Sequence, residues 1–308
     1  MRKDGIAAIG LWRCGAAALL LALAAAIAAA APAVTARRVA DDAWFVQGEA
    51  ALGSAANRNF ISNAGFVVTS AGVVVIDALG SPALARELLA EIHRVTPQPV
   101  RYVVVTHYHA DHVYGLQVFK EAGATIIAHR LGRDYLVSDA AQRRLAATRL
   151  VPADRWIDAD TTLELGDERL LIRHVGPAHT PEDLVVFAER SQVLFAGDLV
   201  FRGRVPYVGT ADSRSWIGAL GGLIELHPAV IVPGHGAEST QPLADLTLTR
   251  EYLRYLRQSM AEAAAQLEPF DDAYEHTDWS AFEHLPLFRA ANRINAYNTY
   301  LLMEQQAK

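Results

Sequence analysis

The chain has 308 residues, is 52% hydrophobic and carries a net charge of −6. That apolar content suffices for one large domain or two small ones, and it excludes a disordered or collagen-like chain. The acidic balance gives the chain no electrostatic reason to bind nucleic acid or an anionic membrane surface.

Residues 1–36 have the pattern of a secretory signal peptide. Basic residues precede an apolar run of mostly Ala and Leu over 14–31, and small residues suited to a signal peptidase follow at 31–33 and 34–36. The alternative is a retained membrane anchor, but alanine is a weak hydrophobe and inserts poorly. We therefore expect a periplasmic or secreted protein with no stable membrane insertion after cleavage.

Cys14 is the only cysteine, and it lies in the signal segment. The exported chain would have no disulfide and no thiolate ligand. Any metal must then be bound by histidine and carboxylate groups.

The first half of the mature chain alternates between strands and helices. Strands are predicted at 44–47, 64–69, 73–76, 100–105 and 125–128, with a hairpin turn at 70–72. Ser81 caps a helix that has Pro82 in its first turn and reaches about His93. Further helices are predicted at 113–121 and 133–147. The run 100–105 is apolar enough for a strand buried on both faces.

A second half begins near Asp160 and repeats the order of hairpin strands, buried strand, loop and helix. Strands are predicted at 163–165, 169–175, 184–188, 193–196 and 230–232. Helices are predicted at 215–226, 243–267 and 288–305. Two sheets packed face to face with helices outside would bury these runs in one α/β domain over 37–308, with a helical tail from about 243.

A dense group of metal-binding side chains follows the strand at 100–105: His107, His109, Asp111 and His112. In an extended segment the first two histidines point to the same side, while the last two residues sit where the next helix starts. Two neighbouring sets of ligands suit two metals better than one. The alternative, a solvated surface loop, is disfavoured because buried unpaired imidazoles and carboxylates are costly to desolvate.

Three more candidate ligands, His179, Asp198 and His235, each lie just past the C-terminal end of a predicted strand. Open sheets place their sites at that edge. Nearby glycines allow the tight turns that bring such loops together; they are Gly176, Gly197, Gly234 and Gly236. Six other histidines are expected to be structural: His93, His129, His174, His227, His276 and His284. Of these, His129 and His174 stand at strand ends near the site and are candidates to support a ligand.

The order of these residues resembles the metallo-β-lactamase superfamily of hydrolases, whose His-x-His-x-Asp-His motif matches His107 to His112. The resemblance covers about Trp44 to Glu238. It implies a four-layer αβ/βα sandwich, with two mixed sheets face to face, helices outside and a dinuclear site in the groove between the sheets.

The resemblance also implies the role of each ligand. The first metal is bound by His107, His109 and His179. The second is bound by Asp111, His112 and His235. Asp198 bridges both, and Asp77 accepts a hydrogen bond that orients a ligand. Two Zn²⁺ ions are the expected cofactors, although iron or manganese also suits ligands without sulfur.

The implied reaction is hydrolysis of an ester, thioester, lactone or amide bond by a hydroxide shared between the metals. Asp111 would take the hydroxide proton and pass it to the leaving group. Candidates to bind an anionic small-molecule substrate or an oxyanion are Arg58, Arg204 and Tyr207. The alternative for each is an ordinary solvated side chain. The loop at 48–63 resembles a flap over the groove.

Asp198 separates this chain from the best-known β-lactamases, which have cysteine at that position. An aspartate there resembles the thioester, phosphodiester and lactone hydrolases instead. The blocks at 176–180, 194–207 and 211–216 resemble exported zinc hydrolases found beside periplasmic quinoprotein dehydrogenases. Three alternatives stay open: a true β-lactamase, a mononuclear iron dioxygenase of persulfides, and a non-catalytic metal- or sulfur-binding accessory protein. The sequence specifies no oligomeric state.

Overall fold

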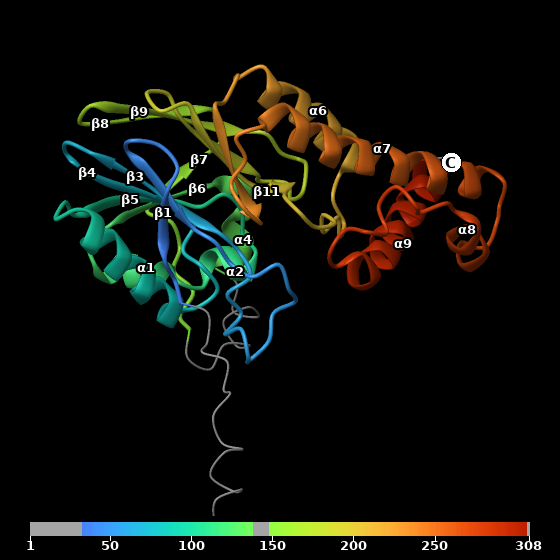
Figure 1. The fold of residues 1–308 in the computed structure, drawn as a ribbon, viewed down its shortest axis with the longest axis horizontal. Coiled ribbons are helices and arrows are strands. Elements are labelled where there is room, and N and C mark those ends of the chain that lie inside the picture. Colours follow the sequence, from blue (N-terminus) through green and yellow to red (C-terminus); the bar gives the residue numbers. More distant parts are fainter. Residues whose placement is uncertain (1–32, 138–147, 307–308) are drawn as a thin grey trace, which may run out of the picture. The chain divides into compact units, whose positions relative to one another are not determined.

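Two mixed sheets form the centre of the computed structural model, which describes residues 33–137 and 148–306 (Figure 1). Within these ranges one sheet has seven strands in the order β1-β2-β3-β4-β5-β6-β7, and the other has five in the order β12-β11-β10-β9-β8. The strands of the first sheet are β1 (Ala36–Arg38), β2 (Ala43–Val46), β3 (Ala64–Thr69), β4 (Gly72–Ile76), β5 (Val100–Val104), β6 (Thr125–His129) and β7 (Arg155–Ile157). Those of the second are β8 (Thr161–Leu165), β9 (Glu168–His174), β10 (Leu184–Ala188), β11 (Val193–Phe201) and β12 (Val230–His235).

Helices flank the sheets in the described part of the chain. They are α1 (Pro82–Val95), α2 (Ala110–Val113), α3 (Leu116–Glu121), the 3-10 turn η1 (Arg130–Gly132), α4 (Arg133–Leu136), α6 (Ser213–Ile224), α7 (Pro242–Ala265), α8 (Phe270–His276) and α9 (Phe288–Gln306). Most of the helix predicted at 133–147 lies outside the described residues, as does the predicted signal segment up to residue 32. None of the described helices is both long and apolar enough to cross a membrane.

Three apolar clusters hold these layers together. One lies between the sheets and includes Phe45, Val74 and Phe195. A second joins the seven-stranded sheet to α1 and α3, and a third joins the five-stranded sheet to α6 and α7. Each fully buried Phe or Val side chain contributes about 1.5–3 kcal/mol relative to an exposed one. The expected four-layer α/β sandwich is therefore confirmed.

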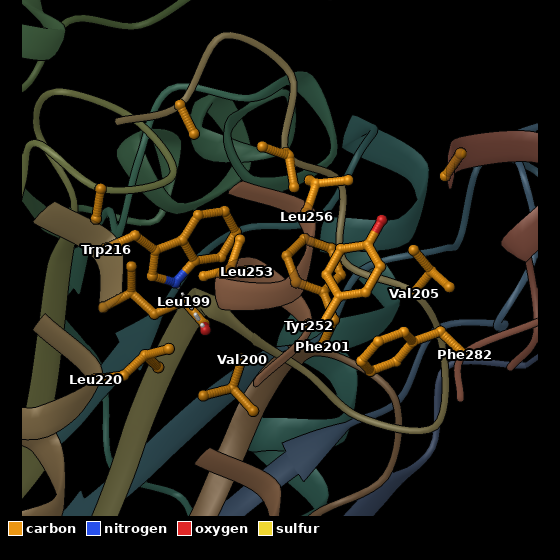
Figure 2. Packing of buried hydrophobic residues seen from close by; sticks show 14 of the residues in the cluster. Leu199, Val200, Phe201, Val205, Trp216, Leu220, Tyr252, Leu253, Leu256 and Phe282 are labelled. Atoms are coloured by element: carbon orange, nitrogen blue, oxygen red, sulfur yellow. Dashed lines mark hydrogen bonds between the residues drawn. The ribbon is translucent and has the colours of Figure 1, made fainter. Parts of the chain in front are cut away.

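The third cluster reaches the end of β11, close to Asp198 (Figure 2). Trp216 of α6 is fully buried there, and its indole Nε1 donates a hydrogen bond of 3.2 Å to the carbonyl oxygen of Leu199. Tyr252 of α7 packs into the same cluster. Because a buried indole N–H needs a partner, this bond fixes α6 against the strand that carries Asp198.

The helix predicted at 113–121 is two helices, α2 and α3, that are separated at Gly115. A Cβ atom at this position would lie 1.9 Å from the carbonyl oxygen of Ala78, so only glycine fits where the chain between α2 and α3 lies against the segment that contains Ala78. As a result α2 begins at Ala110 and contains Asp111 and His112.

The strand predicted to end at Ala196 continues to Phe201, and its register against β12 shifts on both sides of Gly197. Asp198 therefore lies within β11 at an irregular point and not after the strand. Four short elements of the described part of the chain, β1, β7, η1 and α8, are not predicted from the sequence. Nor is β5 buried on both faces throughout, because Arg101 near its start is exposed.

Residues 34–36, at the end of the segment predicted as the signal peptide, belong to the fold. Val34 is buried in the cluster beneath α1, and Ala36 pairs with Val46 in the first sheet. Contacts group the residues from Val34 onward into one compact unit.

Candidate metal centre

All seven predicted ligands come together at one edge of the sandwich. His107 and His109 follow β5, and Asp111 and His112 lie on α2. The other three come from the second sheet: His179 follows β9, Asp198 is within β11, and His235 ends β12. Their ligating atoms form two groups in which all atoms lie within 4.8 Å of one another. The groups are His107, His109, His179 and Asp198, and Asp111, His112 and His235.

In the first group, three imidazole nitrogens converge. His109 Nδ1 lies 3.1 Å from His107 Nε2 and 3.0 Å from His179 Nε2. Two nitrogens bound at zinc distances to one tetrahedral ion are separated by about 3.3 Å. The spacing therefore fits a single tetrahedral cation.

In the second group, Asp111 faces two imidazoles. Its Oδ2 lies 3.4 Å from His235 Nε2 and 3.7 Å from His112 Nε2. Asp198 reaches both groups, because its Oδ1 is 3.2 Å from His112 Nε2 and its Oδ2 is 3.4 Å from His179 Nε2. A carboxylate in that position can bridge two cations.

Two buried atoms that face the centre, His112 Nε2 and Asp198 Oδ1, complete no hydrogen bond with any residue that the structure describes. Nearly all buried polar side-chain atoms in proteins have a partner. Both atoms face the other ligands, so the donor set fits divalent cations bound by nitrogen and oxygen.

The charge states in the first group also suit metal binding. Burial lowers the pKa values of His107 and His109, and that of His179 falls to about 3, so these imidazoles are neutral and offer a lone pair. Burial alone would raise the pKa of Asp198, but His235, His112 and His107 hold it well below its ordinary value. Asp198 is therefore an anionic carboxylate.

Asp77 orients one of the ligands. It follows β4 with φ of 63°, a left-handed conformation that Asp tolerates better than most residues. Its Oδ1 accepts the backbone N–H of Thr106 at 2.8 Å, and its Oδ2 accepts the Thr106 hydroxyl at 2.7 Å. The same Oδ2 lies 2.8 Å from His112 Nδ1, so this nitrogen donates and Nε2 is left free for a metal.

Replacing Asp77 by asparagine is expected to weaken metal binding about 10- to 100-fold, the usual effect of removing such a partner. In either orientation the amide would set an N–H₂ group against another donor, the N–H of His112 or the backbone N–H of Thr106. A competition titration with a chromogenic zinc chelator measures the change. Asp134→Asn, on the exposed surface of α4, is the control. An unchanged metal affinity in Asp77→Asn would show that Asp77 does not orient His112 for metal binding.

Other residues that brace the centre are not predicted from the sequence. His235 Nδ1 donates to the carbonyl oxygen of Ile61 at 2.7 Å, and Ser62 Oγ donates to that of Asp111 at 2.6 Å. The end of the 48–63 loop thus supports two ligands. Glu182 accepts the backbone N–H of Tyr108 at 3.0 Å. Of these residues only Glu182, close to His179, lies near a ligand in the sequence.

Gly234 shows how closely the strands approach at the site. A Cβ atom there would lie 2.0 Å from Asp198 Oδ1. Any side chain at 234 would displace the carboxylate from its position between the two groups.

The predicted substrate residues have different surroundings. Tyr207 is 44% exposed and lines a hollow of about 420 Å³ together with His109 and His179. Arg204 is only 6% exposed, and its guanidinium lies over the ring of Phe201 at 5.5 Å. Arg58 forms an ion pair with Glu87 of α1, so its charge is directed to a carboxylate of the chain itself.

Two of the remaining histidines contact each other. His129 and His174 stack with ring centroids 3.8 Å apart. His276 pairs with Glu268. Neither arrangement adds a ligand to the centre.

The chain belongs to the metallo-beta-lactamase superfamily, whose pattern matches residues 57–235. This superfamily is hydrolytic, and the cluster of His and Asp side chains implies divalent metal ions. The resemblance stated from the motif is therefore confirmed at the level of the superfamily.

Particular relatives fall into two groups. The chain is 26% identical to a metallo-beta-lactamase type 2 of Elizabethkingia meningoseptica, over 61% of this chain and 74% of that protein. It is 25% identical to the linear primary-alkylsulfatase of Pseudomonas sp. (strain ATCC 19151), over 62% of this chain but only 43% of that protein.

Solved structures share the fold. A metallo-beta-lactamase from Pontibacter korlensis has a TM-score of 0.61 at 24% identity and covers 72% of this chain and 99% of its own. The inverting sec-alkylsulfatase Pisa1 from Pseudomonas sp. has a TM-score of 0.69 at 15% identity and covers 87% of this chain and 50% of its own.

Proposed function

We propose that the protein is an exported hydrolase that uses two zinc ions to cleave an ester, thioester, lactone or amide bond in a small molecule. The observation that supports this most directly is the position of Asp198 between two groups of ligands, 3.2 Å from His112 and 3.4 Å from His179. When bound, the metals supply Lewis acidity and a water acidified towards neutral pH.

Asp111 is the proposed proton carrier. Its side chain is 21% exposed, against 5% for Asp198, so it borders both the ligands and the solvent-filled side of the site. Its Oδ2 would accept a proton from the attacking water and deliver it to the leaving group.

Arg204 is the proposed partner for negative charge on the substrate. Among the residues described, its guanidinium forms no ion pair, although it is nearly fully buried. It stacks on Phe201, and Phe201 stacks on the ring of His235 at 5.0 Å. A buried cation beside the centre is favourable when an anion completes its hydrogen bonds.

We expect Arg204→Met to lower kcat/KM for an anionic ester about 10- to 100-fold, since a hydrogen bond to a charged group contributes about 1.5–3 kcal/mol. A neutral ester of the same shape should lose much less. Steady-state kinetics with the matched pair measures this, and Arg204→Lys should retain part of the preference. Equal losses on both esters would contradict the assignment.

Arg204 also favours a second candidate, hydrolysis of a sulfate ester. Alkylsulfatases are among the relatives and share the fold. A sulfate ester presents its negative charge at the scissile group. Arg204 is near enough to the ligands for the carboxylates of Asp198 and Asp111 to oppose the lowering of its pKa by burial.

Metal analysis followed by a substrate panel tests the proposal. Two zinc ions per chain with turnover of an ester, thioester, lactone or amide would support it, and turnover of alkyl sulfate alone would favour the second candidate. Selective cleavage of a cephalosporin would favour a β-lactamase. One iron per chain with oxygen uptake on a persulfide would favour a dioxygenase. Full metal with no turnover would favour an accessory protein.

Export is part of the same proposal. Val34 is buried and Ala36 is within β1, so cleavage after Ala33 would keep the first strand intact. Cleavage after Ala36 would remove a buried side chain and a paired residue.

A further inference from the structure

A second hollow, of about 240 Å³, adjoins the one at the metal centre. The two share five lining residues, namely 208–211 of the loop before α6 and Asn298 of α9. His109 and His179 line the first hollow but not the second, so the second hollow is reached from the ligands through the first. A substrate long enough to leave the first hollow past Asn298 would enter the second.

The described residues that line the second hollow include no charged side chain. Val208, Leu301 and Leu302 supply apolar surface, while Asn298 and Gln305 supply amide groups. An ionised group placed there would lose its hydration without gaining a partner of opposite charge. The occupant that this lining favours is therefore uncharged.

A buried threonine also lines the second hollow. Thr299 is 2% exposed, and its Oγ1 has no hydrogen-bond partner among the described residues. Such atoms are rare in folded proteins. A largely aliphatic arm that carries one uncharged hydrogen-bonding group could satisfy it.

The wall between the hollows is held in place by a buried asparagine. Asn295 of α9 accepts the backbone N–H of Val208 at 2.9 Å and donates to the carbonyl oxygen of Pro206 at 2.8 Å. Its amide also donates to the hydroxyl of Tyr252 on α7 at 2.9 Å. The loop is thus fixed to two helices before any ligand arrives, which lowers the entropy lost on binding.

We propose that the second hollow binds an extended, uncharged aliphatic arm of the substrate and that α9 sets the preference for it. This inference rests on the proposed hydrolase function, because the reacting bond would lie at the centre while the arm passes Asn298. Helix α9 lies outside residues 57–235, so this preference would belong to the helical tail and not to the part matched to the superfamily.

Binding of straight-chain primary alcohols from ethanol to octanol, measured by calorimetry, tests the hollow without any turnover, because an alcohol has no bond that the proposed hydrolase cleaves. We expect affinity to rise about two- to four-fold per added methylene, the range for partial to full burial of a CH₂ group. Leu301→Trp, which fills the second hollow, should abolish the dependence on chain length. Leu248→Trp is the control, since it alters another apolar surface on α7. Affinity independent of chain length, or an equal loss in the control, would overturn the inference.

Turnover of carboxylic esters with acyl chains of the same lengths separates this inference from the proposed function. Chain-length-dependent binding of the alcohols without turnover of any ester, thioester, lactone or amide would support the assignment of the hollow and contradict the hydrolase function. Hydrolysis of esters at one rate for all lengths, with alcohol binding that does not depend on length, would support the hydrolase function and contradict the binding of an arm.

Discussion

Asp198→Asn is expected to abolish metal binding and turnover together. Asp198 is a buried anion that contacts imidazoles of both ligand groups, including His235 Nε2 at 3.3 Å. Removing one partner from a buried charged set costs about 3–5 kcal/mol, which corresponds to about 10³-fold in metal affinity. Zinc content after dialysis against a competing chelator should fall well below one ion per chain, and hydrolysis should fall to background.

The control for that variant is Asp42→Asn. Asp42 is equally buried and pairs with Arg190 at 2.8 Å, but it is not a ligand. This variant should unfold at a lower temperature and still bind two zinc ions. If Asp198→Asn retained two tightly bound zinc ions, the bridging position would be wrong.

Asp111→Asn is expected to lower kcat about 10³-fold, within the usual range for loss of a general acid–base group, while most of the metal is retained. His112, His235 and Asp198 still face the second position, and an amide oxygen can replace one carboxylate oxygen as a ligand but cannot carry the proton. The measurement is kcat with its pH dependence, alongside zinc content.

The exposed variant Asp134→Asn should match the unchanged protein in both measurements. Full activity in Asp111→Asn would refute its role as proton carrier. Loss of metal and activity together would show that Asp111 is chiefly a ligand.

Elements governed by local chemistry are predicted well from the sequence. The hairpin of β3 and β4 follows from two β-branched runs around a glycine turn, and Ser81 accepts a capping bond from the backbone N–H of Leu84 at 3.2 Å. The ligands are predictable for a similar reason, because few roles other than metal binding explain so many imidazoles and carboxylates just after strand ends.

Features that depend on distant neighbours are not predictable in this way. Gly115, where the helix breaks, donates its backbone N–H to the carbonyl oxygen of Leu79 at 3.0 Å and lies against the carbonyl oxygen of Ala78, both on another segment. Arg58 is a reasonable anion-binding candidate until Glu87 of α1 is placed beside it. The hydrogen bond from His235 to Ile61 spans 174 positions, and no local pattern records it.

The ligands are divided between the two sheets, and this division has a mechanical consequence. Four ligands follow β5 of the seven-stranded sheet, and three belong to the loops and strands of the five-stranded sheet. Cations bound there would cross-link the two sheets. The metal centre would then also stabilise the packing of one sheet on the other, and a chelator that abolishes activity would weaken that packing.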